Sequence, residues 1–393
     1  MLHFLFWLCF FIIFYSYFGY GILIYLLIKI KRLFSKKNTQ TGQIGFEPEV
    51  SLVIASYNEA DFIEKKIQNS LELDYPPEKL RIIIITDGSN DNTTEIIRDY
   101  PKVQLLHQPE RRGKVAAMNR AMQFVRTPYV IFCDANTLLN KACVREIVKH
   151  YANPKVGGVA GEKKILSGVN QQVAGAGEGL YWKYESFLKK LDAEFYSVVG
   201  AAGELFSMKT ALFHKAAENT IIEDFVQSLQ ICKDGYVIGY EPKAYAMESA
   251  SASMREEQKR KIRIAAGAFQ AMVILKDLFN IFKYPVLSFQ FISHRILRWT
   301  LCPLCLVILF FSNAALVYKG AAGFYGVALL LQLAFYAMAW AGWFFAGKNL
   351  QIKAFYVPYY FMFMNLSVFS GFYRFLRKTQ TAVWEKAVRV SGP

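Results

Sequence analysis

The chain has 393 residues, of which 54% are hydrophobic and 16% aromatic, and its formal net charge is +15. The hydrophobic residues gather at both ends of the chain, around a middle part of ordinary soluble composition, which is typical of a membrane protein with a soluble domain. The positive charge could bind nucleic acid, anionic lipid or a phosphorylated substrate. Because the basic clusters flank apolar stretches and no nucleic-acid-binding module is recognisable, we exclude nucleic acid as a partner.

The first 28 residues predict a membrane anchor. They contain no charged side chain except His3 when it is protonated, and they are long enough to span a bilayer. A cleaved signal peptide would begin with basic residues, whereas here Lys29 to Lys37 follow the apolar stretch. The positive-inside rule therefore places the basic linker, residues 29–47, and the domain after it in the cytoplasm.

Residues 48–254 predict an α/β domain. Apolar runs at 50–55, 81–86, 103–107 and 129–133 alternate with helical stretches. Such alternation indicates right-handed βαβ units and a Rossmann-like, mostly parallel sheet.

Three of these predicted strands end in polar or acidic residues, namely Ser56 to Glu59, Asp87 and Asp134. Taken singly, each acidic position could be a turn or a helix cap, and Lys114 could belong to a solvated run of charges. Ligands of open α/β sheets bind beyond the carboxyl ends of the strands. We therefore expect these residues to lie together at a binding site for a nucleotide diphosphate.

The C-terminal part returns to the membrane. A basic run opens a region of predicted interfacial helices at 255–293, and two apolar helices form a predicted transmembrane hairpin at 294–346. Residues 354–376 could be a third spanning helix or lie in the interface. The interface is favoured, because a spanning helix would carry the basic tail, residues 377–393, out of the cytoplasm.

Five motifs occur in order along the chain: Ala55-Ser-Tyr-Asn-Glu59, Thr86-Asp-Gly-Ser-Asn-Asp91, Gly113-Lys-Val-Ala-Ala-Met-Asn119, Asp134-Ala-Asn136 and Ile222-Glu-Asp224. In this order and spacing the chain resembles the family-2 inverting glycosyltransferases with the GT-A fold. It is most similar to their membrane-bound branch of cellulose, hyaluronan and poly-N-acetylglucosamine synthases. The resemblance covers about residues 48 to 390.

The resemblance implies a site for a nucleotide-sugar and a divalent metal. The residues implied to bind the donor are Ser56, Tyr57, Glu59, Asp87, Lys114, Asp134 and Arg263. Asp134 would also hold Mg²⁺ or Mn²⁺, assisted by Asn136. The family pattern has a second aspartate at position 136, so this chain offers a neutral oxygen there.

The resemblance also implies a catalytic pair and an acceptor side. Asp224, preceded by Glu223, would be the general base that deprotonates the acceptor hydroxyl. The residues implied to flank the acceptor are Gly200, Ala201, Ala202, Gly203 and Trp384.

The processive members carry a Gln-x-x-Arg-Trp motif from which this chain departs. Aligning Arg263 with the arginine puts Arg260 at the glutamine and Ile264 at the tryptophan. That tryptophan offers the acceptor sugar an aromatic platform, and isoleucine cannot stack in the same way. The departure favours a transferase of undecided processivity.

The leading hypothesis is an enzyme of the cytoplasmic (cell) membrane that acts in polysaccharide or cell-envelope glycan synthesis. It would transfer a sugar from a nucleotide-sugar, expected to be UDP-linked, with inversion to a glycan or lipid-linked acceptor. An export or accessory subunit could be a further partner. One alternative is a processive synthase that exports its own polymer, for which few spanning helices are available. The other is a non-enzymatic membrane sensor or transporter of nucleotide-sugars, against which the apolar segments carry almost no ionisable residues.

Overall fold

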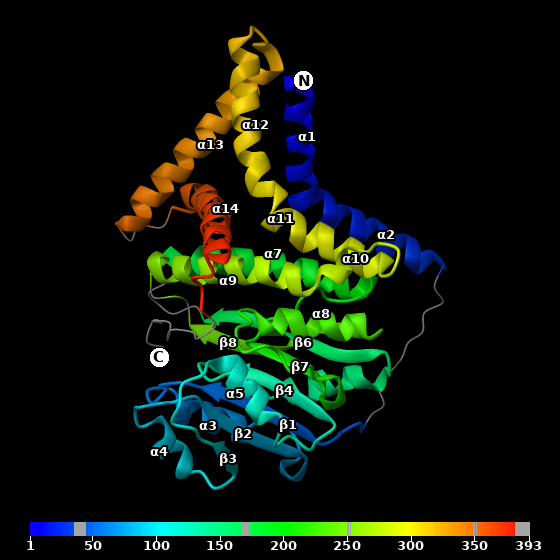
Figure 1. The fold of residues 1–393 in the computed structure, drawn as a ribbon, viewed down its shortest axis with the longest axis vertical. Helices are drawn as coiled ribbons and strands as arrows, with labels where there is room; N and C mark the ends of the chain where they lie inside the picture. Colours follow the sequence, from blue (N-terminus) through cyan, green and yellow to red (C-terminus); the bar gives the residue numbers. More distant parts are fainter. Residues whose placement is uncertain are drawn as a thin grey trace.

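The computed structural model describes residues 1–34, 45–166, 173–249, 251, 253–348, 350 and 352–381. Figure 1 shows three levels: a sheet domain at the bottom, a layer of long helices above it, and a group of upright or tilted helices on top. The lower two levels contain the sheet and the long helices α7 and α9, and the top level contains α1, α12 and α13.

The sheet has eight strands in the order β3-β2-β1-β4-β7-β6-β8-β5, and four of its seven pairings are parallel. This confirms the predicted mostly parallel α/β fold, with an antiparallel part around β7. The strands are β1 (Val50–Ser56), β2 (Leu80–Thr86), β3 (Val103–Leu106), β4 (Tyr129–Asp134), β5 (Thr137–Leu139), β6 (Val156–Leu166), β7 (Leu205–Lys209) and β8 (Val237–Ser249).

Helices and helical turns of the domain cover both faces of this sheet. Along β1, Val53 faces one hydrophobic cluster and Leu52 and Ile54 face the other, as the alternation of side chains along a strand requires. All seven residues of the strand are therefore buried, and all but Ser51 and Ser56 are apolar. The helical elements of the domain are α3 (Ile63–Leu71), η2 (Pro77–Lys79), α4 (Thr93–Arg98), α5 (Lys114–Ala121), α6 (Cys143–Val148), η3 (Lys149–Ala152), η4 (Thr210–Leu212) and α8 (Glu223–Lys233).

Within the described residues, three helical stretches are long and apolar enough to cross a membrane: Leu2–Phe34, Leu301–Tyr318 and Gly323–Gly347. The first bends at a wide turn, η1 (Tyr15–Gly19), so that α1 stands upright and α2 leans over the layer of long helices (Figure 1). The remaining helical elements are α1 (Leu2–Phe14), α2 (Tyr20–Phe34), α7 (Val173–Phe195), α9 (Met254–Ile274), η5 (Lys276–Phe279), α10 (Pro285–Phe291), η6 (Ile292–Ile296), α11 (Leu297–Trp299), α12 (Leu301–Tyr318), α13 (Gly323–Gly347) and α14 (Lys353–Arg377).

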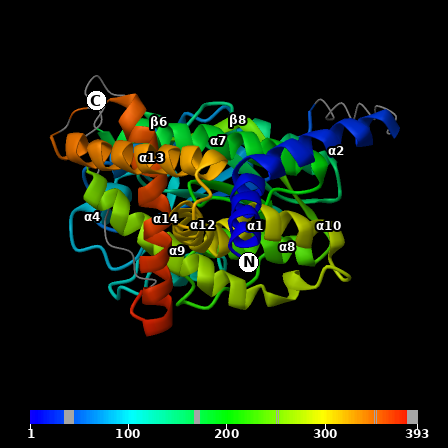
Figure 2. The same ribbon diagram turned by 90° about the horizontal axis from the view of Figure 1, so that it is seen from above.

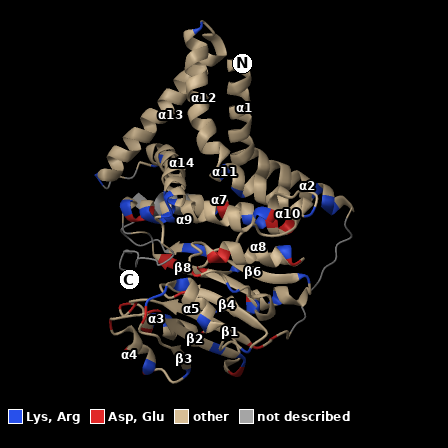
Figure 3. Cartoon of the chain, in the orientation of Figure 1, with Lys and Arg blue, Asp and Glu red and all other residues tan. Residues whose placement is uncertain are grey.

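Helix α14 differs in direction from α1 and α12. Seen from above in Figure 2, α1 and α12 are viewed nearly end-on, whereas α14 is viewed along its length. It lies on α9, where Gly371 is so close to Ala265 that a side chain at position 371 would not fit. The Tyr360 hydroxyl also donates to the buried carboxylate of Glu257 on α9 at 3.1 Å. Figure 3 shows few Lys, Arg, Asp or Glu residues on the top helices and many from α9 and α2 downward.

Candidate active site

The three predicted strand ends meet at one edge of the sheet. Ser56 at the end of β1 is paired with Thr86, the last residue of β2, and Ala55 is paired with Asp134, the last residue of β4. A cavity of about 570 Å³ opens beyond this edge. Helices α7, α9 and α14 contribute to its other walls, so the cavity lies between the sheet and the helices above it.

Lys114 joins the acidic residues of the cavity. Its ammonium Nζ lies 2.7 Å from Asp134 Oδ1 and 3.3 Å from Glu223 Oε1. Burial lowers the pKa of Lys114, but the charges of Asp134, Glu223 and Asp224 outweigh burial and leave the pKa above its ordinary value. The lysine is therefore a fixed positive charge, and it brings strand β4 and helix α8 to one point.

Asp224 lies in the first turn of α8 and lines the same cavity. Burial raises the pKa of its carboxyl to about 7, the negative charge of Glu223 adds to that rise, and Lys114 opposes it. A carboxylate with a pKa near neutrality is well matched to accepting a proton from a hydroxyl. A Cβ at Gly203 would lie 3.2 Å from Asp224 Oδ2, so the glycine keeps the chain close to this carboxylate.

The loop that contains Gly203 is held against α8. Gly200 has a φ of +85°, and a Cβ there would lie 2.0 Å from the Phe225 ring. The Ala201 amide donates to Ser228 Oγ at 3.0 Å. Four of the five residues predicted to flank the acceptor line the cavity, namely Gly200, Ala201, Ala202 and Gly203.

The structure differs from the expectation for Asp87. Its side chain is only 2% exposed and is not among the described residues that line the cavity. Its two carboxylate oxygens accept hydrogen bonds from the backbone amides of Arg112 and Gly113, at 2.9 and 2.7 Å. Asp87 thus fixes the loop that leads into α5, and Lys114 is the first residue of that helix. Through this loop, Asp87 helps to position Lys114.

The remaining predicted donor residues occupy different places. Tyr57 and Glu59 line the cavity, and the Arg111 guanidinium lies 3.8 Å from the centre of the Tyr57 ring. Ser56 is buried, and its hydroxyl has no hydrogen-bond partner within the part of the chain that the structure describes. Arg263 lines the cavity and donates to the Ile221 carbonyl at 3.3 Å.

Two other predictions concern Trp384 and the metal. Trp384 lies outside the described residues. Asp134 and Asn136 both line the cavity, and the buried Glu223 Oε1 has no partner among the described residues except the Lys114 ammonium. Across the described ranges, no group of three or more His, Cys, Asp or Glu side chains could hold a metal. Mg²⁺ is commonly held by one or two carboxylates together with substrate phosphates, so this oxygen donor set fits such an ion.

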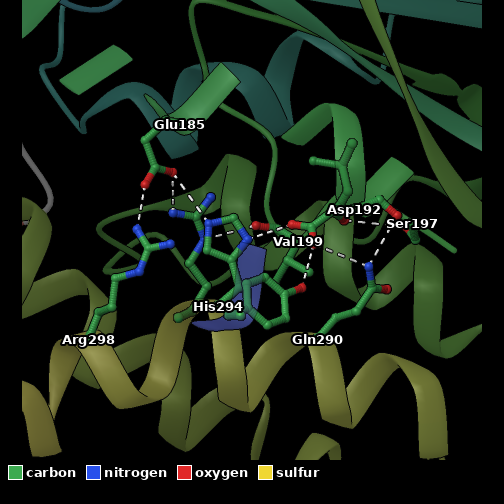
Figure 4. A network of polar contacts seen from close by, with 10 residues as sticks. Glu185, Asp192, Ser197, Val199, Gln290, His294 and Arg298 are labelled. Atoms are coloured by element: carbon green, nitrogen blue, oxygen red, sulfur yellow. Dashed lines mark hydrogen bonds and ion pairs between the residues drawn. The ribbon is translucent and has the colours of Figure 1, made fainter. Parts of the chain in front are cut away.

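A buried polar network behind the loop at residues 199–203 was not predicted from the sequence. Figure 4 shows Glu185 and Asp192 of α7 facing His294 and Arg298, which lie at the base of α12. Glu185 Oε1 accepts from Arg298 Nη1 at 2.7 Å, and Asp192 accepts from His294 Nδ1. Three ionisable residues within an apolar region, at 294, 295 and 298, are the signal that could have drawn attention to it.

Arg295 connects this network to the loop that runs from Val199 to Gly203. Its Nε donates to the Val199 carbonyl at 3.0 Å, and its Nη1 donates to Glu185 Oε2 at 2.7 Å. Burial raises the pKa of Glu185, but Arg295 and Arg298 outweigh burial and hold the pKa well below its ordinary value. Arg295 therefore holds Val199, the residue before Gly200, and is itself held by the buried carboxylate of Glu185.

The fold and the acidic cavity at its strand ends define a GT-A architecture. The chain is similar over 96% of its length to a mannosyltransferase from Pyrobaculum calidifontis, solved in complex with GDP-Man and Mn²⁺. That similarity covers 99% of the solved chain, with a TM-score of 0.71 and 22% sequence identity. At this level of identity the likeness shows the fold.

Residues 51–217 match the model of the family described as glycosyl transferase family 2, and the chain carries a domain of that family. Among curated proteins, it is 30% identical over 249 residues to a poly-β-1,6-N-acetyl-D-glucosamine synthase of Staphylococcus aureus, covering 60% of this chain and 57% of the relative. The protein of the same name from Staphylococcus epidermidis is 28% identical over 271 residues, 65% of this chain and 63% of the relative. The match thus spans less than two thirds of these relatives.

Proposed function

We propose that the protein is a membrane-embedded inverting glycosyltransferase that transfers a sugar from a nucleotide-sugar to a glycan or lipid-linked acceptor. The observation that carries the proposal is the arrangement of Lys114, Asp134 and Asp224. These residues come from α5, β4 and α8, and Lys114 and Asp224 are more than a hundred positions apart in the chain. All three nevertheless line one cavity at the carboxyl edge of the sheet.

Asp224 acts as the general base in this proposal. Its carboxylate takes the proton of the acceptor hydroxyl while the hydroxyl oxygen attacks the anomeric carbon from the face opposite the leaving nucleoside diphosphate. One displacement of this kind inverts the anomeric centre, so an α-linked donor gives a β-linked product. The buried Glu223 beside it helps to keep the pKa of Asp224 near neutrality.

Lys114 and Arg263 stabilise the negative charge that develops on the departing diphosphate. Tyr57 and Glu59 lie on the cavity wall, where the nucleoside would bind, and Asp87 positions the start of α5. A divalent cation, held by Asp134 and Asn136, would neutralise phosphate charge when bound.

The donor we propose is a UDP-linked sugar, with N-acetylglucosamine as the first candidate. The names of the staphylococcal relatives support this sugar. They also support a second candidate function, the synthesis of a polymer by repeated transfer, although position 264 has isoleucine in place of the tryptophan of processive enzymes. An accessory subunit for export is compatible with both functions.

We propose that the protein is a multi-pass protein of the cytoplasmic membrane, with its sheet domain in the cytoplasm. The three candidate spans and the basic residues Lys29, Lys31 and Arg32 at the end of the first support this orientation. In this arrangement α14 lies in the membrane interface, since its direction differs from that of α1 and α12. The predicted domain boundaries remain proposals.

Membranes that contain the protein, incubated with UDP-N-acetylglucosamine, UDP-glucose or GDP-mannose, provide the test. We expect release of nucleoside diphosphate from one donor together with a new glycan or glycolipid detected by mass spectrometry. Long products would support the polymer synthase, and short products the single transferase. No consumption of any donor across such a panel would contradict the proposed function and favour the non-enzymatic sensor.

A further inference from the structure

One face of helix α7 contributes to the wall of the cavity. Trp182, Glu185 and Lys189 follow each other at spacings of three and four residues, which puts them on the same side of the helix. Glu185 pairs with Arg295 and Arg298. Trp182 and Lys189 have no role in the proposed transfer step.

Lys189 is a buried ammonium group without a direct ion-pair partner among the described residues, although the charges of Glu162, Glu204 and Glu185 act on it from a distance. Its side chain is 3% exposed, and it makes no hydrogen bond or ion pair with any residue that the structure describes. Its Nζ lies 5.3 Å from the centre of the Trp182 ring. Burial lowers the pKa of Lys189, the direction expected when charge is not compensated by a direct partner.

Lys163 provides an internal comparison. Its Nζ lies 5.0 Å from the centre of the same Trp182 ring, and the residue is 4% exposed. Lys163 nevertheless pairs with two carboxylates, Glu204 at 2.7 Å and Glu248. Of the two lysines beside this ring, Lys163 has direct carboxylate partners and Lys189 has none among the described residues.

The acidic residues near Lys189 are engaged elsewhere. Glu162 accepts hydrogen bonds from Ser186 and Tyr240, and Glu204 accepts from Lys163. In addition, the indole N–H of Trp182 is buried and donates to no described residue. The wall of this cavity therefore contains two hydrogen-bond donors, Lys189 Nζ and Trp182 Nε1. Neither can accept a hydrogen bond, and neither donates to an acceptor atom of the described residues.

We propose that Lys189 and Trp182 form a subsite that binds an anionic group, a phosphate or a carboxylate, carried by the acceptor substrate. The inference rests on the proposed transferase function. A buried ammonium without a direct partner is costly, and a charged acceptor forms the strongest hydrogen bond with it.

The position of the subsite assigns it to the acceptor. The nucleotide end of the cavity is at Tyr57 and Asp134, on the strand ends. The loop from Gly200 to Glu204 lies between the two ends, since Gly203 adjoins Lys114 and Asp224, and Glu204 adjoins Lys163 beside Trp182. An acceptor with its hydroxyl at Asp224 would thus extend towards α7.

The test uses the full chain in nanodiscs, with the donor that the wild type consumes, and two matched acceptors. These are N-acetylglucosamine 1-phosphate and the uncharged methyl N-acetylglucosaminide. We expect the wild type to prefer the phosphate-bearing acceptor by about 10- to 100-fold in kcat/KM, as a charge-assisted hydrogen bond allows. Lys189→Gln should abolish this preference, whereas the donor KM and the slow hydrolysis of the donor should stay unchanged.

Lys190→Gln is the control, because Lys190 is the exposed neighbour on the same helix. Lys189→Arg keeps the charge and should retain the preference, which separates a lost contact from a misfolded protein. Two further acceptors distinguish the sources of the anion, a farnesyl-diphosphate-linked N-acetylglucosamine and a disaccharide that contains glucuronic acid. Preference for the first assigns a lipid phosphate, and preference for the second a glycan carboxylate.

Transfer by the wild type without preference for any acidic acceptor would overturn the inference and leave the proposed function intact. The same holds if Lys189→Gln keeps the wild-type preference. A wild type that consumes no donor would instead overturn the proposed function, and the subsite with it.

Discussion

At the scale of single residues, the site depends on the interactions of the Lys114 ammonium with the carboxylates around it. Lys114 contacts Asp134 and Glu223 directly, while Asp224, the next residue after Glu223, remains the carboxyl whose pKa is raised to about 7. Burial and the charge of Glu223 raise the pKa of Asp224 and Lys114 opposes them, which suits the Asp224 carboxylate to accept a proton.

The raised pKa of Asp224 predicts a pH dependence of transfer. Below about pH 7 the carboxyl of the free enzyme is protonated and cannot accept a proton, so kcat/KM should fall about tenfold for each unit of pH, and above pH 7 it should level off. Initial rates of nucleoside diphosphate release between pH 5 and 9 measure this profile. A rate that is flat from pH 5 to 7 would remove Asp224 as the base.

Glu223→Gln should move this acid limb to lower pH. The charge of Glu223 is, after burial, the next largest cause of the raised pKa of Asp224, so its removal lowers that pKa. The same pH series applied to the variant checks the shift. Glu218→Gln is the control, since Glu218 is largely exposed and pairs with Arg112 outside the cavity wall. An unchanged midpoint in Glu223→Gln would contradict this electrostatic coupling.

At the scale of elements, the loop from Gly200 to Gly203 is specified by close packing on α8. Gly200→Ala would push a methyl group into the Phe225 ring at a positive φ, and overpacking of this kind costs about 1–3 kcal/mol in addition to the backbone strain. We expect a lower unfolding temperature and a lower rate of transfer. Gly235→Ala has a similar φ of +90° but open space around it, so it isolates the backbone cost. Equal effects of the two variants would exclude the packing explanation.

The network between α7 and the base of α12 makes a second prediction at this scale. Glu185→Gln leaves Arg295 and Arg298 without their carboxylate, and breaking a buried ion pair costs about 3–5 kcal/mol. The unfolding temperature in detergent should therefore fall clearly. Glu194→Gln, on the same helix, removes only the more exposed pair with Arg32 and should have little effect. A Glu185→Gln variant as stable as Glu194→Gln would show that the network does not support the junction.

At the scale of the whole molecule, the sequence predicted the half of the site that follows strand ends. The apolar runs before Ser56, Asp87 and Asp134 are local signals, and the parallel sheet brings their ends together as expected. The antiparallel part around β7 was not predicted, because no local pattern distinguishes it from a further parallel strand.

The buried network behind the cavity could not be predicted, because its residues are distant in the chain and lie within helices. Glu185 and Arg295 are 110 positions apart, and their pairing depends on how α7 packs against the base of α12. Asp87 shows the complementary case. Its motif was recognised, but whether its carboxylate faces a ligand or the backbone amides of Arg112 and Gly113 depends on the path of a loop. Side-chain direction of this kind is not encoded in a local spacing.

The central claim is that the protein transfers a sugar with inversion and that Asp224 is the base. Proton NMR of the product formed from an α-linked UDP-sugar tests it most directly, by the anomeric coupling constant, with the wild type and Asp224→Asn compared at equal protein concentration. The account predicts a β-linked product from the wild type, and a rate about 10²- to 10⁴-fold lower for Asp224→Asn. An α-linked product, or an Asp224→Asn variant that transfers at the wild-type rate, would contradict it.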